Sequence, residues 1–142
     1  MKIVKRKSKL IPWRIVENHF EFYLSHRSKN AKQFPDLWSF WGGGIEENET
    51  PKQALIREIQ EELNWQPTLF EFLGTYYDSM PNEKFIFFTR VNENFEKQIE
   101  IRESQGGKFF TKDEIVKEET IISEDKKPLF DLFDHLTKTV ML

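Results

Sequence analysis

The sequence contains no cysteine, which excludes disulfide bonds and thiolate metal sites. No stretch approaches the ~18 apolar residues that a membrane-spanning helix needs, so no membrane partner is expected. The basic N-terminus has no apolar segment behind it, so a secretory signal is not expected and the default location is cytoplasmic. Positive charge is not in excess either, because 21 Lys and Arg face 24 Asp and Glu. A net charge of −3 argues against a nucleic-acid partner.

The chain has 142 residues, enough for one domain spanning 1–142 with a real core and too few for two. Hydrophobic residues make up 38% and charged residues 32%, a balance typical of a globular protein. The 14 phenylalanines are read as core residues. The first ten residues, MKIVKRKSKL, are locally basic. We expect a solvated first strand there, although these side chains could also contact phosphates or pair with a partner chain in a homodimer.

Alternating apolar residues and turn signals predict a mixture of strands and helices. The strands are expected at 11–16, 19–26, 37–41, 69–79, 83–91 and 108–111, and the helices at 51–63, 112–118 and 126–138. The polar stretch 92–105 is expected to be a loop with a short strand. Strands mixed with helices in this order predict an α/β or α+β sandwich.

The helix at 51–63 has clear signals at both ends. Thr50 is a good N-cap, Pro51 suits the first helical position, and Gln53 completes a capping box. Asn64 follows the last helical residue, where a left-handed cap is expected. At ~100° per residue, one face of this helix should be buried. The residues expected on that face are Leu55, Ile56, Ile59 and Leu63.

Three glutamates, Glu58, Glu61 and Glu62, share a different face of the same helix. Like charges at this spacing repel, at roughly 0.2–0.5 kcal/mol per pair in an isolated helix. Arg57 is placed to answer only Glu61. One interpretation is an ordinary exposed acidic face. The other is that a hard divalent cation such as Mg²⁺ sits between the carboxylates, since Mg²⁺ binds oxygen ligands together with substrate phosphates.

A glycine run, Gly42 to Gly44, stands directly before this helix. Alone, such a run is usually a turn. Beside a cluster of carboxylates it suggests a place where backbone groups approach a ligand closely. Carboxylates would hold a metal, the metal would hold phosphate, and the glycines would leave room for both.

The stretch GGGIEENETPKQALIREIQEELNW resembles the Nudix box of the MutT-like pyrophosphohydrolases, whose pattern is G-x5-E-x7-R-E-U-x-E-E-x-G-U. Gly43 opens the box, and every specified position matches except Asn64, which replaces Gly. Because Asn is the next-best residue for positive φ, this departure costs little. A second departure is Trp41, where many members have Pro, and it could reshape the pocket wall.

The resemblance extends beyond the box. Family members often carry a further glutamate in a segment shaped like E-x-Q-x-G, and ESQGGKFF at 103–110 looks like that segment. The stretch from His26-Arg27 to the glycines looks like the family's opening hairpin. The resemblance implies a Nudix-type α/β/α sandwich with a mixed β-sheet.

For this chain the resemblance implies a Mg²⁺-dependent hydrolase, with Mn²⁺ as a substitute, that cleaves a nucleoside diphosphate linked to another group. It implies metal ligands at Glu58, Glu61, Glu62, Gly42 and Glu103. It implies catalytic roles for Glu61, Glu103, Arg57 and Glu49, in which Arg57 orients Glu49 and either Glu61 or Glu103 is the general base. Substrate binding is expected at Arg27, Gly42, Gly43 and Trp38.

The substrate itself stays open. Candidates are an ordinary or oxidised nucleoside triphosphate, ADP-ribose, a nucleotide sugar or a dinucleoside polyphosphate. Pro81, about sixteen residues after the box, can accompany ADP-ribose hydrolysis in the family, but it also fits an ordinary hairpin turn. Two other readings are a non-catalytic nucleotide-binding module and a structural protein with an acidic helix.

Overall fold

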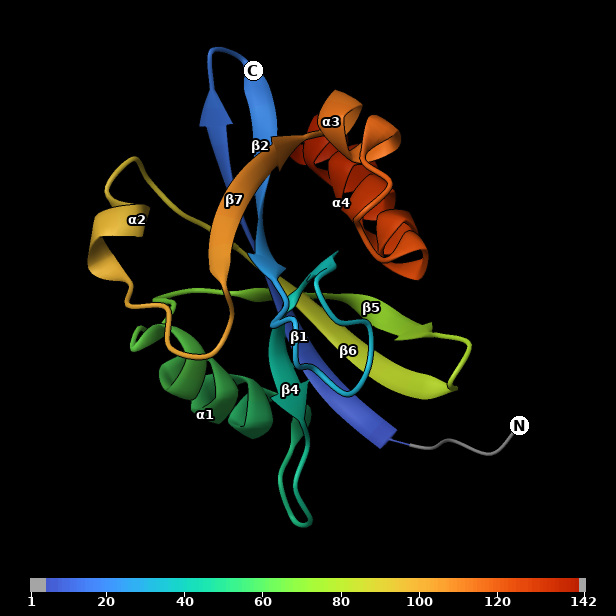
Figure 1. Ribbon diagram of the computed structural model, residues 1–142. Helices are drawn as coiled ribbons and strands as arrows, with labels where there is room; N and C mark the ends of the chain where they lie inside the picture. The colour runs from blue at the N-terminus through green and yellow to red at the C-terminus, as the bar shows by residue number, and fades with distance from the viewer. Residues whose placement is uncertain (1–4, 141–142) are drawn as a thin grey trace.

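The computed structural model describes residues 5–140, which form one mixed sheet with helices on both sides (Figure 1). The predicted α+β class is confirmed. The strands are β1 Lys5–Val16, β2 His19–His26, β3 Trp38–Ser39, β4 Trp41–Gly44, β5 Glu71–Tyr77, β6 Asn82–Arg90 and β7 Gly106–Thr111. The helices are α1 Pro51–Leu63, α2 Phe95–Gln98, α3 Lys112–Lys117 and α4 Lys126–Thr139, with a 3₁₀ turn at Ser123–Asp125.

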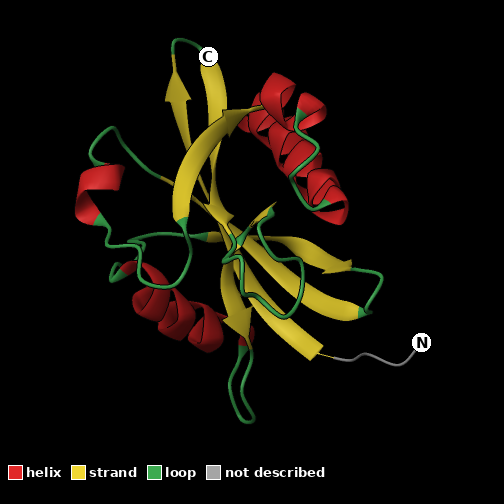
Figure 2. Ribbon diagram, in the orientation of Figure 1, coloured by secondary structure: helices red, strands yellow, loops and turns green. Residues whose placement is uncertain are grey.

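The sheet has the order β3-β2-β1-β6-β5, with β4 paired to β1 and β7 paired to β2. The β1 and β6 strands run parallel, and the other neighbours run antiparallel. Helix α1 lies on one side of the sheet, whereas α3 and α4 lie on the other (Figures 1 and 2). Among the described residues, no helix is long and apolar enough to cross a membrane.

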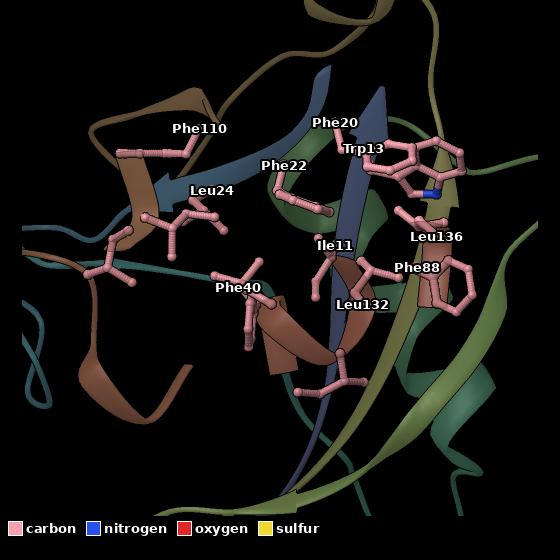
Figure 3. Close-up of a cluster of buried hydrophobic side chains, with 14 residues drawn as sticks. Ile11, Trp13, Phe20, Phe22, Leu24, Phe40, Phe88, Phe110, Leu132 and Leu136 are labelled. Carbon is pink, nitrogen blue, oxygen red and sulfur yellow. The ribbon is translucent and has the colours of Figure 1, made fainter. Parts of the chain in front are cut away.

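Two hydrophobic clusters form the core. The larger one joins the sheet to α4 and includes Ile11, Phe88 and Leu132 (Figure 3). The second joins the sheet to α1 and includes Leu10, Leu55 and Phe87. Because side chains alternate along a strand, neighbouring residues of β1 and β6 enter different clusters.

Helix α1 begins and ends where its capping signals predict. The Thr50 hydroxyl accepts a hydrogen bond from the Gln53 amide, and the Gln53 side chain accepts one from the Thr50 amide. Asn64 has a left-handed conformation with φ 47°. One prediction for its face was wrong: Ile56 is 45% exposed, and Ala54 is buried instead. The face of α1 that packs against the sheet is therefore narrower than its apolar pattern suggested.

Of the basic N-terminal stretch predicted to be a solvated strand, residues 1–4 lie outside the described residues. Lys5 and Arg6 are exposed as predicted, but the strand is buried from Ser8 to Trp13, contrary to the prediction. It is a central strand, paired to β6 from Lys5 to Trp13 and to β2 or β4 on its other edge. Ser8 and Lys9 are buried. Over Lys5–Val16 this strand therefore has little free edge to offer a partner chain, and the suggested pairing in a homodimer has no support here.

Two segments differ from their predicted structure. The stretch 92–105 contains the short helix α2, anchored by the buried Phe95, and no strand. The stretch 37–41 is divided into β3 and β4, and the glycines themselves form part of β4. Trp41 is buried, stacks on Tyr23 with ring centroids 5.5 Å apart, and donates to its carbonyl. It belongs to the core rather than to a pocket wall.

Candidate functional site

The glycines of β4 allow α1 to bring its carboxylates against the strand backbone. Gly42 has φ +119°, and a Cβ atom there would lie 2.1 Å from the Ser8 carbonyl oxygen. A Cβ atom on Gly43 would lie 2.6 Å from a carboxylate oxygen of Glu58. No side chain fits at either position without displacing its neighbours. The glycines are thus needed for contacts within the protein.

Arg57 holds the acidic face of α1 together. Its Nε and Nη2 atoms donate to the two oxygens of Glu49 at 2.8 and 2.9 Å, the contact expected from the sequence. Its Nη1 atom also lies 3.2 Å from Glu58 and 3.5 Å from Glu61. The prediction that Arg57 answers only one glutamate of the helix was therefore too narrow. Such bidentate, charge-assisted contacts fix both groups in orientation.

The Arg57 contact makes a testable contribution to stability. Its hydrogen bonds, followed by one from the Glu46 amide, lower the pKa of Glu49 from 4.5 to about 2. A group with a depressed folded pKa stabilises the fold above its unfolded pKa and loses this effect as pH falls through the folded pKa. We expect Glu49→Gln to be less stable than wild type at about pH 7, with the difference shrinking toward about pH 2.

Urea unfolding across this pH range measures the effect. The exposed Glu47, two residues earlier, provides the control variant Glu47→Gln, which should follow wild type throughout. A destabilisation of Glu49→Gln that stays constant down to about pH 2 would contradict the assignment.

Glu62 is held against β4 by a hydrogen bond from the Gly42 backbone. The Gly42 amide donates to Glu62 Oε1 at 2.6 Å, and the ammonium group of Lys9 donates to the Gly42 carbonyl at 3.1 Å. Burial raises the pKa of Glu62, while the Lys9 charge and the Gly42 hydrogen bond oppose this rise. Burial also raises the pKa of Glu58, against Arg57. Nearby cations therefore stabilise the charged form of these two buried α1 carboxylates.

The second predicted segment is fastened to the end of α1. The amides of Glu100 and Arg102 donate to the carbonyls of Leu63 and Glu62 at 2.9 and 3.0 Å. Gln105 donates to the Arg27 carbonyl at 2.7 Å. These bonds bring the exposed Glu103 to a cavity of about 160 Å³. That cavity is also lined by Arg27, Phe40, Gly42 and Glu62.

A smaller cavity of about 20 Å³ lies beside the first, and Arg27 and Phe40 line both. Its wall carries the buried charges of Asp78, Lys84 and Asp125, together with Lys7 and Lys9. Lys84 Nζ lies 3.1 Å from Asp125 and 3.4 Å from Asp78. This charged wall therefore adjoins the larger cavity through Arg27 and Phe40.

Arg27 and Trp38 have different surroundings. Arg27 lines both cavities, and the Gln33 and Phe34 carbonyls accept its hydrogen bonds at 2.8–3.1 Å. Trp38 lines neither cavity and stacks on the His26 ring at 4.5 Å between centroids. A role for Trp38 in substrate binding stays a prediction.

The donor set suits a hard metal ion in its chemistry. The predicted ligands offer only oxygen atoms, which Mg²⁺ and Mn²⁺ prefer. They are Glu58, Glu61, Glu62, Glu103 and the Gly42 carbonyl. Within residues 5–140, however, no three His, Cys, Asp or Glu side chains converge on one metal-sized centre. Arg57 contacts Glu58 and Glu61. Metal binding at these residues therefore requires side-chain movement, with some glutamates turning away from Arg57.

Sequence reasoning missed Lys9 and the Asp78–Lys84–Asp125 cluster. For Lys9 a signal was present. It lies two and four residues before Ile11 and Trp13, so it shares with them the face of the strand that is buried in the core. For the cluster there was none, since Asp125, in the 3₁₀ turn, lies 41 residues after its partner Lys84 on β6.

A comparison with models of known protein families identifies the family of this chain. The model of the NUDIX domain matches residues 13–133, most of the chain. The chain belongs to the NUDIX domain family. The resemblance drawn from the box is thereby confirmed.

The relatives of this NUDIX chain are named for different nucleotide substrates. An 8-oxo-dGTP diphosphatase of Proteus vulgaris is 33% identical over 78 residues, which cover 55% of this chain and 69% of that protein. A CTP pyrophosphohydrolase of Escherichia coli is 36% identical over 62 residues, covering 44% of this chain and 45% of that protein. The NUDIX domain of Shewanella oneidensis NrtR, solved with ADP ribose, superposes with a TM-score of 0.76 at 16% identity, over 96% of this chain and 90% of that chain. The structural likeness shows the fold alone.

Proposed function

We propose that this chain is a divalent-metal-dependent pyrophosphohydrolase that cleaves a nucleoside diphosphate linked to another group. The observation that carries the proposal is the meeting of Gly42, Glu62, Glu103 and Arg27 on one cavity, next to a NUDIX box that retains its arginine and all its glutamates. This cavity joins an acidic side, suited to a metal, to a cationic side, suited to phosphate. The names of the relatives, a diphosphatase and a pyrophosphohydrolase, support the same reaction class.

The residues would divide the work as follows. Arg27 is held by loop carbonyls, and burial lowers its pKa, so a phosphate oxygen is a favourable partner for its charge. Arg57 keeps Glu49 and Glu58 in place. Glu103 and Glu61 are exposed carboxylates, so water can reach either of them and either could be the general base.

Glu58, Glu61, Glu62, Glu103 and the Gly42 carbonyl are the groups that would hold the metal. When bound, Mg²⁺ or Mn²⁺ would neutralise the pyrophosphate and lower the pKa of the attacking water. The protein itself contributes a pocket whose carboxylates and arginine are held in position before the reaction begins, so that they need not reorganise as charge develops on the phosphate.

The substrate is best found by direct turnover. A panel of 8-oxo-dGTP, ordinary NTPs and dNTPs, ADP-ribose, nucleotide sugars and a dinucleoside tetraphosphate should be tested with Mg²⁺ and with Mn²⁺. We expect one class to stand out, with products that identify the phosphorus attacked. If no compound is hydrolysed while one still binds in calorimetry, the chain is a nucleotide-binding module and the enzymatic proposal is wrong.

A further inference from the structure

Lys9 is a charged residue that is buried in the protein. It is only 8% exposed, and its ammonium group lies 3.1 Å from the Gly42 carbonyl oxygen. A neutral carbonyl alone does not compensate a buried ammonium ion, which needs an opposite charge nearby. Glu62 supplies this charge, because it is bonded to the amide of the same glycine at 2.6 Å and is the strongest favourable charge acting on Lys9. Lys9, Gly42 and Glu62 therefore form one unit.

The unit contains two groups that the proposed function assigns to the metal. The Gly42 carbonyl is one expected ligand and Glu62 is another. Lys9 already places a positive charge on this carbonyl, inside the protein and fixed to a central strand. The ammonium group there bonds the Gly42 carbonyl oxygen, one of the atoms that would attract a divalent cation, and its charge also acts on Glu62.

We propose that Lys9 is a positioning residue that acts as a resident cation at Gly42 and Glu62, and that it weakens divalent-metal binding at this corner of the site. This inference rests on the proposed metal-dependent function. Without metal, Lys9 fixes the Gly42 carbonyl and its charge attracts the Glu62 carboxylate, and a metal entering beside Lys9 meets a like charge. Even in a water-like dielectric, a unit charge ~6 Å from a divalent ion changes its affinity by roughly tenfold.

Lys7 provides a matched control. It lies two residues earlier on the same face of β1, lines the smaller cavity, and is paired in register with Gly44 rather than Gly42. Burial lowers the pKa of Lys7 as it does that of Lys9. Lys7→Met therefore removes a comparable charge without touching Gly42.

The experiment is a titration of the metal-free protein with Mn²⁺, in which free Mn²⁺ is followed by its electron paramagnetic resonance signal. We expect Lys9→Met to bind Mn²⁺ at least about tenfold more tightly than wild type. Lys7→Met should show a clearly smaller change. Binding by Lys9→Met that equals wild type, or is weaker, overturns the inference. If no variant binds Mn²⁺, the metal-dependent function itself fails, which is a different result.

A second measurement keeps the inference testable if Lys9→Met is poorly stable. Thermal unfolding in chelator compares Lys9→Met, Glu62→Gln and the double variant. Since Lys9 and Glu62 are expected to compensate each other, the double variant should be more stable than the sum of the two single losses predicts. Additive losses would show that Lys9 serves only the carbonyl, and the inference would be wrong.

Discussion

Glu62→Gln should lower turnover by at least about a hundredfold while the fold stays intact. Glutamine keeps the shape of the side chain and an oxygen that can accept the Gly42 amide hydrogen bond. It removes the negative charge that would hold a metal beside the phosphates. The effect should fall on kcat with the best substrate of the panel, because the proposed role of the lost charge is to stabilise the transition state.

The control for this result is Glu47→Gln, an exposed position of the same box whose residue type the pattern leaves open. It should retain wild-type turnover. Circular dichroism and thermal unfolding should show that both variants are folded. Near-normal turnover of Glu62→Gln would remove Glu62 from the metal site and with it the main support for the mechanism.

Lys84→Met should produce the largest loss of stability of any change discussed. Lys84 is 7% exposed and its ammonium group lies 3.1 Å from Asp125, which is 2% exposed. Removing one partner of a buried pair leaves an uncompensated charge, at a cost of about 3–5 kcal/mol. Asp78 is less affected, because it also accepts hydrogen bonds from Met80 and Asn82.

The cost should depend on pH with a definite sign. Burial raises the pKa of Asp125, and Lys84 is the main group opposing this rise. Without Lys84, folding must retain a proton on Asp125 that the unfolded chain releases above its ordinary pKa of 3.8. The stability of Lys84→Met should therefore fall, relative to wild type, as pH increases from about 4.

Urea unfolding gives the free energies. Lys127→Met is the exposed control, since Lys127 pairs with Asp131 on the surface of α4, and it should cost about 0–1 kcal/mol. The double variant Lys84→Met/Asp125→Asn removes both charges and should recover much of the loss. A double variant as unstable as the sum of its parts would mean that the ion pair contributes little.

The sequence alone determined helix α1. Thr50, Pro51 and Gln53 fix its start and Asn64 its end, because capping depends on atoms within one turn. The box spacing also determined the family and placed Arg57 beside Glu49, since that contact is largely local. The β2 and β6 strands and the final helix followed equally from local pattern.

Only the tertiary structure decided the environment of these elements. Local pattern cannot say which strand is central, so the basic β1 was taken for a solvated strand although β6 flanks it. Burial of Lys9, the exposure of Ile56 and the core position of Trp41 depend on which neighbours cover each side chain. The Asp78–Lys84–Asp125 cluster and the approach of Glu103 to Glu62 join segments about forty residues apart, and such contacts exist only once the sheet has formed.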